Sequence, residues 1–136
     1  MKVKSDTLNG AGLIWAMCVA LGHSPVVAAT GVTFRGDHGS WEYPRFTDDA
    51  EIGPLMASEW VGVDRPSKGQ NPPVWRAITD VKYKKKYGDS LVTVVSAYDP
   101  SLAIAVCRAI VMSRLGEVVE LPDEYELIKD NKELGA

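Results

Sequence analysis

Aromatic and arginine side chains form the chemically most suggestive set in this chain of 136 residues. Aromatic planes stack on nucleobases, and guanidinium groups bind phosphate oxygens in pairs. A pocket that holds a nucleotide needs both kinds of group. Stacking faces could come from Trp15, Trp41, Tyr43, Trp60, Trp75 and Tyr98, and paired phosphate contacts from Arg35, Arg45, Arg76 and Arg108. From this set the predicted site residues are Trp15, Trp41, Tyr43, Arg45 and Arg108. The alternative is that most of the aromatic side chains belong to the hydrophobic core.

Arg108 stands out because it interrupts an apolar helical pattern. Apolar residues recur at helical spacing on two faces of the stretch 99–122. A guanidinium in such a helix needs a partner, since burying an unpaired charge is costly. The sequence leaves three kinds of partner open: an internal carboxylate such as Glu117 or Glu120, a facing subunit, or an anionic ligand.

The usual catalytic and metal-binding patterns do not occur in the sequence. His23 and His38 lie at predicted turns, and there is no G-x-S-x-G, P-loop or Rossmann glycine pattern. Asp48, Asp49 and Glu51 could bind a cation but lack the spacing of an EF-hand. We therefore expect binding without catalysis, with no metal and no cofactor.

Composition narrows the possible partners. The formal net charge of −3 argues against a general nucleic-acid binder. The basic cluster at 82–86 is expected to be a solvated hairpin tip, with phosphate or nucleic-acid contact as the alternative. The apolar run 13–21 is too short to span a membrane. Polar residues and glycines before it favour a helix of the folded domain over a secretory signal, so we expect a cytoplasmic protein.

Two apolar helices must position the candidate residues. The first is predicted at 9–21 with Asn9 as its N-cap. The second is predicted to begin with Asp99 as N-cap and Pro100 in the first turn, and to end at Gly116. Both are apolar nearly all round and should be buried on more than one side. One small sheet cannot cover so much apolar surface, so we expect a homo-oligomer. Cys18 and Cys107, one in each helix, are expected to be buried free thiols, with a disulfide between the helices as the alternative.

Runs of β-favouring residues predict an antiparallel sheet. The predicted strands are 1–4, 26–29, 32–34, 40–43, 59–64, 74–81, 91–98 and 117–121. Residues 44–56 are predicted to be a loop, because Pro44, Gly53 and Pro54 are breakers. We therefore expect an α+β fold in which two apolar helices pack on one face of an antiparallel β-sheet. A single domain is expected over 1–122, followed by a charged tail at 123–136.

The two ends of the chain carry specific motifs. An N-terminal pattern Leu-x-Gly-Ala-x-Leu-x-Trp-Ala is met by Leu8, Gly10, Ala11, Leu13, Trp15 and Ala16. A C-terminal pattern, an arginine-containing helix that ends Leu-Gly-x-x-Val-x-Val-Pro, is met by Arg108, Val111, Ser113, Leu115, Gly116, Val119 and Pro122, with Leu121 for the last valine. In both, the chain resembles the NinX-like family of small phage proteins, although Asp49 and Gly53 depart from the family's central pattern. The resemblance implies a phage origin and no established chemistry.

The layout of an N-terminal helix, an antiparallel sheet and a C-terminal helix is also similar to that of the Thoeris anti-defence proteins. Those sequester a cyclised ADP-ribose signal at oligomer interfaces and do not cleave it. The likeness leads us to expect a phage-encoded sponge for a small nucleotide immune signal. Its site would be a crevice between Trp15 and Arg108, reached by Arg45. The alternative is a phage accessory protein that binds a protein partner and no small ligand, while hydrolysis of the signal is disfavoured.

Overall fold

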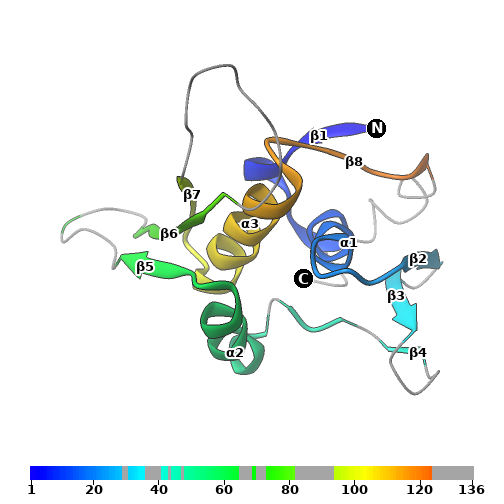
Figure 1. Cartoon of the computed structure of the whole chain (residues 1–136), viewed down its shortest axis with the longest axis horizontal. Coiled ribbons are helices and arrows are strands. Elements are labelled where there is room, and N and C mark those ends of the chain that lie inside the picture. The colour runs from blue at the N-terminus through cyan, green and yellow to red at the C-terminus, as the bar shows by residue number, and fades with distance from the viewer. Residues whose placement is uncertain are drawn as a thin grey trace.

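The computed structural model describes residues 1–28, 31–35, 41–42, 44–46, 48–64, 69, 73–81 and 94–123. Helices and antiparallel strands alternate irregularly along these ranges, which confirms the predicted α+β class (Figure 1). The helices are α1 (Gly10–Ala20), α2 (Asp49–Glu59) and α3 (Leu102–Leu115), with a 3-10 turn, η1, at Ser5–Thr7. The strands are β1 (Lys2–Lys4), β2 (Pro25–Ala28), β3 (Gly31–Arg35), β4 (Trp41–Glu42), β5 (Gly62–Asp64), β6 (Trp75–Asp80), β7 (Val94–Asp99) and β8 (Val118–Glu120).

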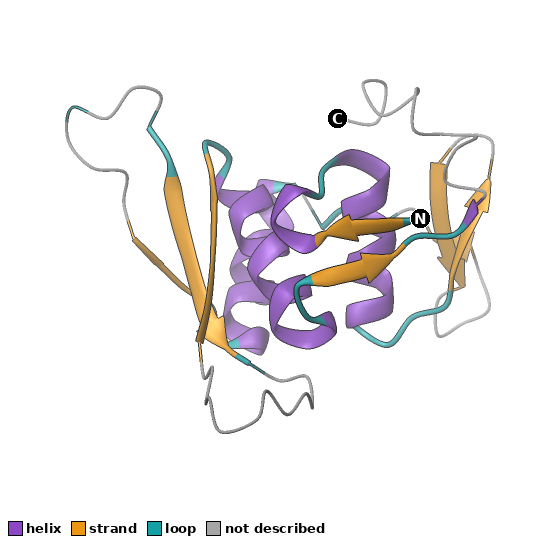
Figure 2. Ribbon diagram, turned by 90° about the horizontal axis from the view of Figure 1, so that it is seen from above, coloured by secondary structure: helices purple, strands orange, loops and turns teal. Residues whose placement is uncertain are grey.

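The predicted single sheet is wrong. The described strands form three small antiparallel sheets, in the orders β1–β8, β2–β3–β4 and β5–β6–β7. The helices lie in the middle of the molecule, with the two three-stranded sheets at opposite ends and the β1–β8 ribbon along one side (Figure 2). α3 packs on β6 and β7, α1 packs on β2 and β3, and the two helices pack against each other. A helix that is apolar all round can therefore be covered by different sheets on different sides.

The packing of α1 against α3 removes the reason for which we expected an oligomer. The inner residues of α1, such as Leu13 and Met17, are fully buried within one chain, and so are Val106 and Ile110 of α3. Much of the apolar perimeter of both helices is thus covered within one chain, that of α1 by β2, β3 and α3, and that of α3 by β6, β7, α1 and α2. Any self-association must be argued from another surface.

The ends of α3 follow the sequence only in part. Ser101 is the N-cap, and its hydroxyl accepts a hydrogen bond from the N–H of Ile104 at 3.3 Å. The prediction that Asp99 caps α3 is wrong, because Asp99 is the last residue of β7 and accepts from the N–H of Ser101 at 2.8 Å. Gly116 ends the helix as predicted, with a φ of 94° that suits glycine.

Several predicted strands are confirmed. β6 pairs with β7 in antiparallel register, from Trp75 opposite Asp99 to Asp80 opposite Val94. β2 and β3 form a hairpin, and β4 returns along β3. β1 pairs with β8 and so joins the two ends of the described chain.

The predicted loop at 44–56 is wrong, because α2 occupies 49–59. Proline in a helix leaves the carbonyl four residues earlier without its N–H partner. Here both Pro54 and Ala50 are exposed, so water can solvate that carbonyl. The helix ends at Trp60, which adopts the left-handed conformation (φ 56°, ψ 47°), and β5 starts two residues later. The strand predicted at 59–64 is therefore limited to Gly62–Asp64.

No helix in the described part of the chain is long and apolar enough to cross a membrane. The tail predicted at 123–136 lies outside the described residues except for Asp123.

Candidate functional site

Arg108 lies where three segments meet. Its Nε donates to the carbonyl of Leu8 at 2.7 Å, just before α1. Its Nη1 donates to the carbonyl of Tyr98 at 3.1 Å and to Oδ1 of Asp99 at 3.0 Å, both at the end of β7. Arg108 is buried, and these bonds satisfy a charge that would otherwise be costly to bury.

The partner of Arg108 is therefore an internal carboxylate, as one of the three alternatives foresaw. The suggested acids Glu117 and Glu120 were wrong, because the acid is Asp99. The guanidinium holds β7, α3 and the segment before α1 together, so its Nε and Nη1 groups are engaged by the protein itself. This geometry favours a structural role for Arg108 over phosphate binding.

Trp15 lies at the junction of two hydrophobic clusters. It is partly buried and packs against the main core and against a smaller cluster formed by Cys18, Val32 and Phe34. Phe46 packs against the same two clusters, and its carbonyl accepts from the thiol of Cys107 at 3.3 Å. Most of Trp15 therefore serves the core.

Of the other predicted site residues, Trp41, Tyr43 and Arg45, only Arg45 has a described side chain. Arg45, next to Phe46, is exposed, and its carbonyl accepts from the N–H of Asp48 at 3.0 Å. Trp41 is described only as backbone in β4, opposite Arg35. Tyr43 lies outside the described residues, and so do His38 and the basic cluster at 82–86.

Groups that could do acid–base or nucleophilic chemistry are tied to the fold. The ring of His23 stacks on that of Phe34, with centroids 4.3 Å apart. Cys18 and Cys107 are buried and free, as predicted. Burial raises the pKa of each thiol to about 12, so both stay protonated at neutral pH and are poor nucleophiles. No group of three potential metal ligands occurs within the described ranges.

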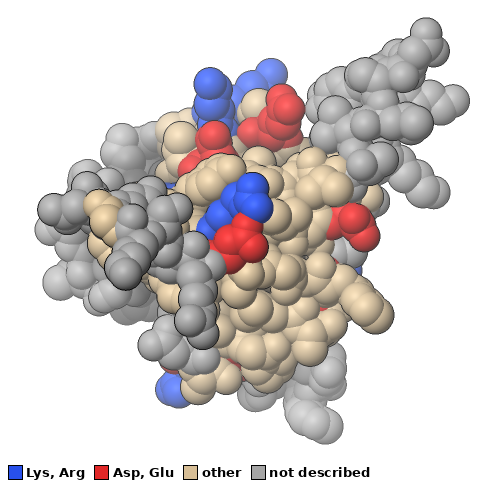
Figure 3. All heavy atoms as spheres, turned by 90° about the vertical axis from the view of Figure 1, so that its left-hand side faces the viewer, with Lys and Arg blue, Asp and Glu red and all other residues tan. Residues whose placement is uncertain are grey.

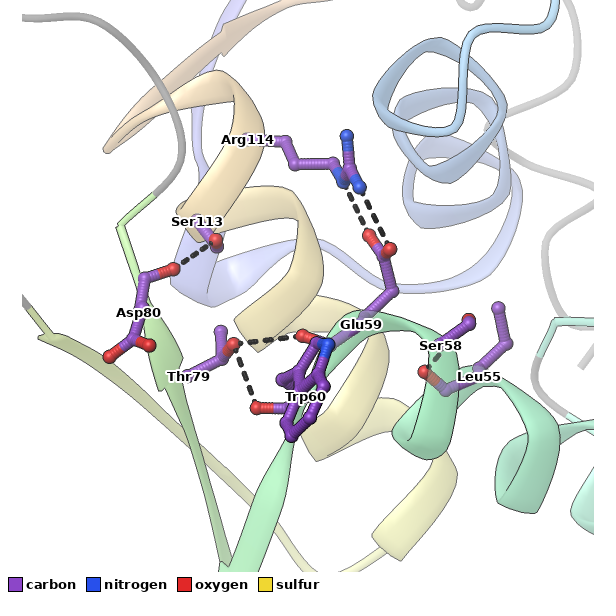
Figure 4. A network of polar contacts seen from close by, with 8 residues as sticks. All are labelled: Leu55, Ser58, Glu59, Trp60, Thr79, Asp80, Ser113 and Arg114. Atoms are coloured by element: carbon purple, nitrogen blue, oxygen red, sulfur yellow. Dashed lines mark hydrogen bonds and ion pairs between the residues drawn. The ribbon is translucent and has the colours of Figure 1, made fainter.

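Trp60 is one of the six aromatic residues that the sequence offered as stacking faces, but it was not among the predicted site residues. It lies between α2 and β5 and is 81% exposed, more than any other large apolar side chain described (Figure 4). Its carbonyl and that of Glu59 share the single proton of the Thr79 hydroxyl, each at 3.2 Å from the oxygen, and this shared hydrogen bond ties the turn to β6. The exposed residues nearest in sequence are small: Ala57, Ser58 and Gly62. The indole therefore projects from a firmly held turn without large neighbours along the chain.

On the side of the molecule formed by β5, β6 and β7, groups of opposite charge lie next to each other near the centre of the described surface (Figure 3). Arg76 on β6 contacts Oδ2 of Asp64 on β5 through its guanidinium. That carboxylate raises the pKa of Arg76, and the Tyr98 side chain adds to the effect. Both charged side chains are about half exposed, so the pair contributes little to stability.

Comparison with known proteins does not identify the chain: no family model matches it, and no curated protein matches it. The resemblance at its two ends to the NinX-like family stays a prediction.

Proposed function

We propose that this protein acts by binding a partner protein without catalysis, and that Trp60 is the anchor of the contact. The observation that carries the proposal is the combination of exposure and conformation at Trp60. Tryptophan is enriched among the residues that dominate binding energies, because its large ring fills a pocket and its N–H finds one acceptor.

Two features at Trp60 are unfavourable for an isolated chain. A left-handed residue with a Cβ costs roughly 1–2 kcal/mol, and glycine or asparagine would relieve much of it. The exposed indole also forgoes the free energy that burial of a large apolar side chain brings. Insertion into an apolar pocket of a partner would offset both. The small residues beside Trp60 leave room for the rim of such a pocket.

Replacing Trp60 with asparagine tests the proposal. Asparagine tolerates the left-handed conformation, so the free energy of unfolding should stay within about 0.5 kcal/mol of wild type or rise. A partner protein is first captured with the immobilised wild-type chain and then purified. Calorimetry should show that it binds the variant less tightly than wild type, with a loss of binding free energy of at least about 2 kcal/mol.

The matched control is Val26→Asn, an exposed apolar position on β2, which lies at the opposite end of the molecule from β5 (Figure 1). It should leave the affinity for the partner unchanged. Equal binding of the purified partner by Trp60→Asn and wild type would refute the proposal, and so would failure of the wild-type chain to bind any protein.

A second candidate is the sequestration of a small nucleotide signal of the cyclic ADP-ribose type, in the setting of phage infection that the resemblance implies. It is favoured by one observation: exposed Arg45 adjoins Phe46, which packs against the same two clusters as Trp15. The Arg45 guanidinium is exposed and lies next to an aromatic residue. It could therefore bind phosphate oxygens of a nucleotide whose base stacks on the aromatic rings.

Calorimetry with a cyclic ADP-ribose isomer tests this second candidate. If it is correct, wild type binds and Arg45→Ala loses at least tenfold in affinity, about 1.4 kcal/mol. Lys4→Ala, an exposed cation on β1, is the control and should bind as wild type does. Arg108→Ala cannot serve here, since that side chain supports the fold. Absence of heat with wild type, or equal binding by Arg45→Ala, would exclude the candidate.

A further inference from the structure

β7 is an edge strand with features that favour pairing. Within the described residues it pairs on one side only, with β6. Residues 94–98 read Val-Val-Ser-Ala-Tyr, with no charge, proline or glycine. Edge strands of monomeric proteins are usually protected from pairing by lysines, prolines or bulges. Residues 94–98, the first five of the six residues of β7, include neither a lysine nor a proline.

Burial alternates along β7. Val95 and Ala97 are buried on the face that α3 covers, and the other face presents Val94 and Tyr98, which are 46% and 56% exposed. Ser96 lies midway between them on the same face. Two of the six exposed large apolar side chains among the described residues are thus on one edge strand.

Antiparallel pairing of this strand with itself is complementary. If the twofold axis passes through Ser96, Val94 lies opposite the partner's Tyr98, and Tyr98 lies opposite the partner's Val94. Aromatic and β-branched residues that face each other across an antiparallel pair stabilise it. On the other face Val95 lies opposite the partner's Ala97, and no charge faces a like charge within residues 94–98.

We infer that β7 pairs with β7 of a second copy of this chain around Ser96, which joins the two β5–β6–β7 sheets into one six-stranded antiparallel sheet. The contact is isologous, so it closes as a dimer and does not propagate. Arg108 holds the carbonyl of Tyr98 and so steadies the end of the strand. A carbonyl has two lone pairs and can accept a second hydrogen bond from the partner.

This contact is independent of the proposed function, because Trp60 lies next to β5, at the opposite edge of the same sheet. A failure of partner binding at Trp60 therefore leaves the dimer intact, and the reverse also holds.

Sedimentation velocity of the full chain, from about 1 to 100 µM, tests the inference. Wild type should dimerise in this range. Val94→Lys/Tyr98→Lys places two like charges opposite each other twice, so it should raise the dimer dissociation constant at least tenfold. Val94→Lys/Tyr98→Glu should restore dimerisation, because each introduced lysine then faces an introduced glutamate of the other copy. The control is Val26→Lys. Val26 lies on another sheet and is 46% exposed, as Val94 is, so this variant should dimerise as wild type does.

A cysteine at the axis tests the register. Ser96→Cys should form a disulfide-linked dimer with oxidised glutathione, whereas Val94→Cys should not, since its two copies lie about four residues apart along the strands. The natural thiols are buried and do not compete. A monomeric wild type, a dimer that survives the double-lysine change, a lysine–glutamate variant that stays monomeric, or equal cross-linking at 94 and 96 would each overturn the inference.

Discussion

Asp99→Ala is expected to lower the free energy of unfolding by about 3–5 kcal/mol, measured by urea denaturation. The side chains of Asp99 and Arg108 are only 19% and 11% exposed, so the change leaves a nearly buried guanidinium without its carboxylate. It also removes the acceptor of the Ser101 N–H at the start of α3. Loss of a helix cap alone would cost only about 0.5–2 kcal/mol.

Three further variants distinguish the contribution of the Asp99–Arg108 ion pair from that of the helix cap and from the effect of removing any acidic side chain. Ser101→Ala removes the true N-cap and should cost about 1 kcal/mol. Asp6→Ala, an exposed acid in η1, should stay within about 0.5 kcal/mol of wild type. Asp99→Ala/Arg108→Met removes both charges and should cost less than the sum of the two single changes, by about 0.5–3 kcal/mol. If Asp99→Ala costs no more than Ser101→Ala, the pair does not support the fold.

The two long helices could be predicted because their signals are local. Long apolar patterns run through α1 and α3, interrupted in α3 by Arg108 and near its end by Ser113 and Arg114, and Gly116 marks the end of α3 within the sequence itself. Ser101 and Asp99 are two residues apart and both can cap, so sequence alone could not choose between them. The error about Arg108 follows from the same choice, since an Asp99 assigned to the cap was not available as its partner.

The arrangement of the strands could not be predicted in the same way. Alternation predicts a strand but not its partner, so nothing local distinguishes one sheet from three. β1 and β8 pair although they lie at opposite ends of the described chain. The pairing of β6 with β7 was accessible because the two strands are consecutive in the chain.

The sequence of α2 has an apolar pattern at helical spacing, but Gly53 and Pro54 led us to predict a loop. Ile52, Leu55, Met56 and Glu59 recur at helical spacing and form its inner face, on which Ile52 and Glu59 are buried and the other two partly buried. Gly53 and Pro54 lie on the exposed side, where they do least harm to a helix. The acid at the last inner position also broke the apolar pattern. The exposure of Trp60 had no local signal, because it precedes apolar residues typical of a strand.

That acid, Glu59, leads to a second large effect. Arg114→Met should lower the free energy of unfolding by about 2–3 kcal/mol. The Glu59 carboxylate is 6% exposed and lies at the C-terminal end of α2, where the helix dipole disfavours a negative charge. Arg114 in the last turn of α3 binds it with Nε and Nη2, the latter at 2.8 Å (Figure 4). The same contact raises the pKa of Arg114. This loss is smaller than that of Asp99→Ala because the Arg114 side chain is 36% exposed and water screens the ion pair.

The matched control for Arg114→Met is Arg76→Met, because Arg76 also binds a carboxylate through two nitrogens but in an exposed pair. It should leave the urea midpoint unchanged. Amide hydrogen exchange in Arg114→Met should quicken first in α2, since the ion pair joins that helix to α3, whereas β6 and β7 should keep their protection. Glu59→Gln should lower the free energy of unfolding by less than Arg114→Met does. The amide carries no charge, so no unpaired charge is left buried, although the contact with Arg114 is weakened. Equal midpoints for Arg114→Met and Arg76→Met would contradict this account, and the other contacts of α2 would then suffice to hold it in place.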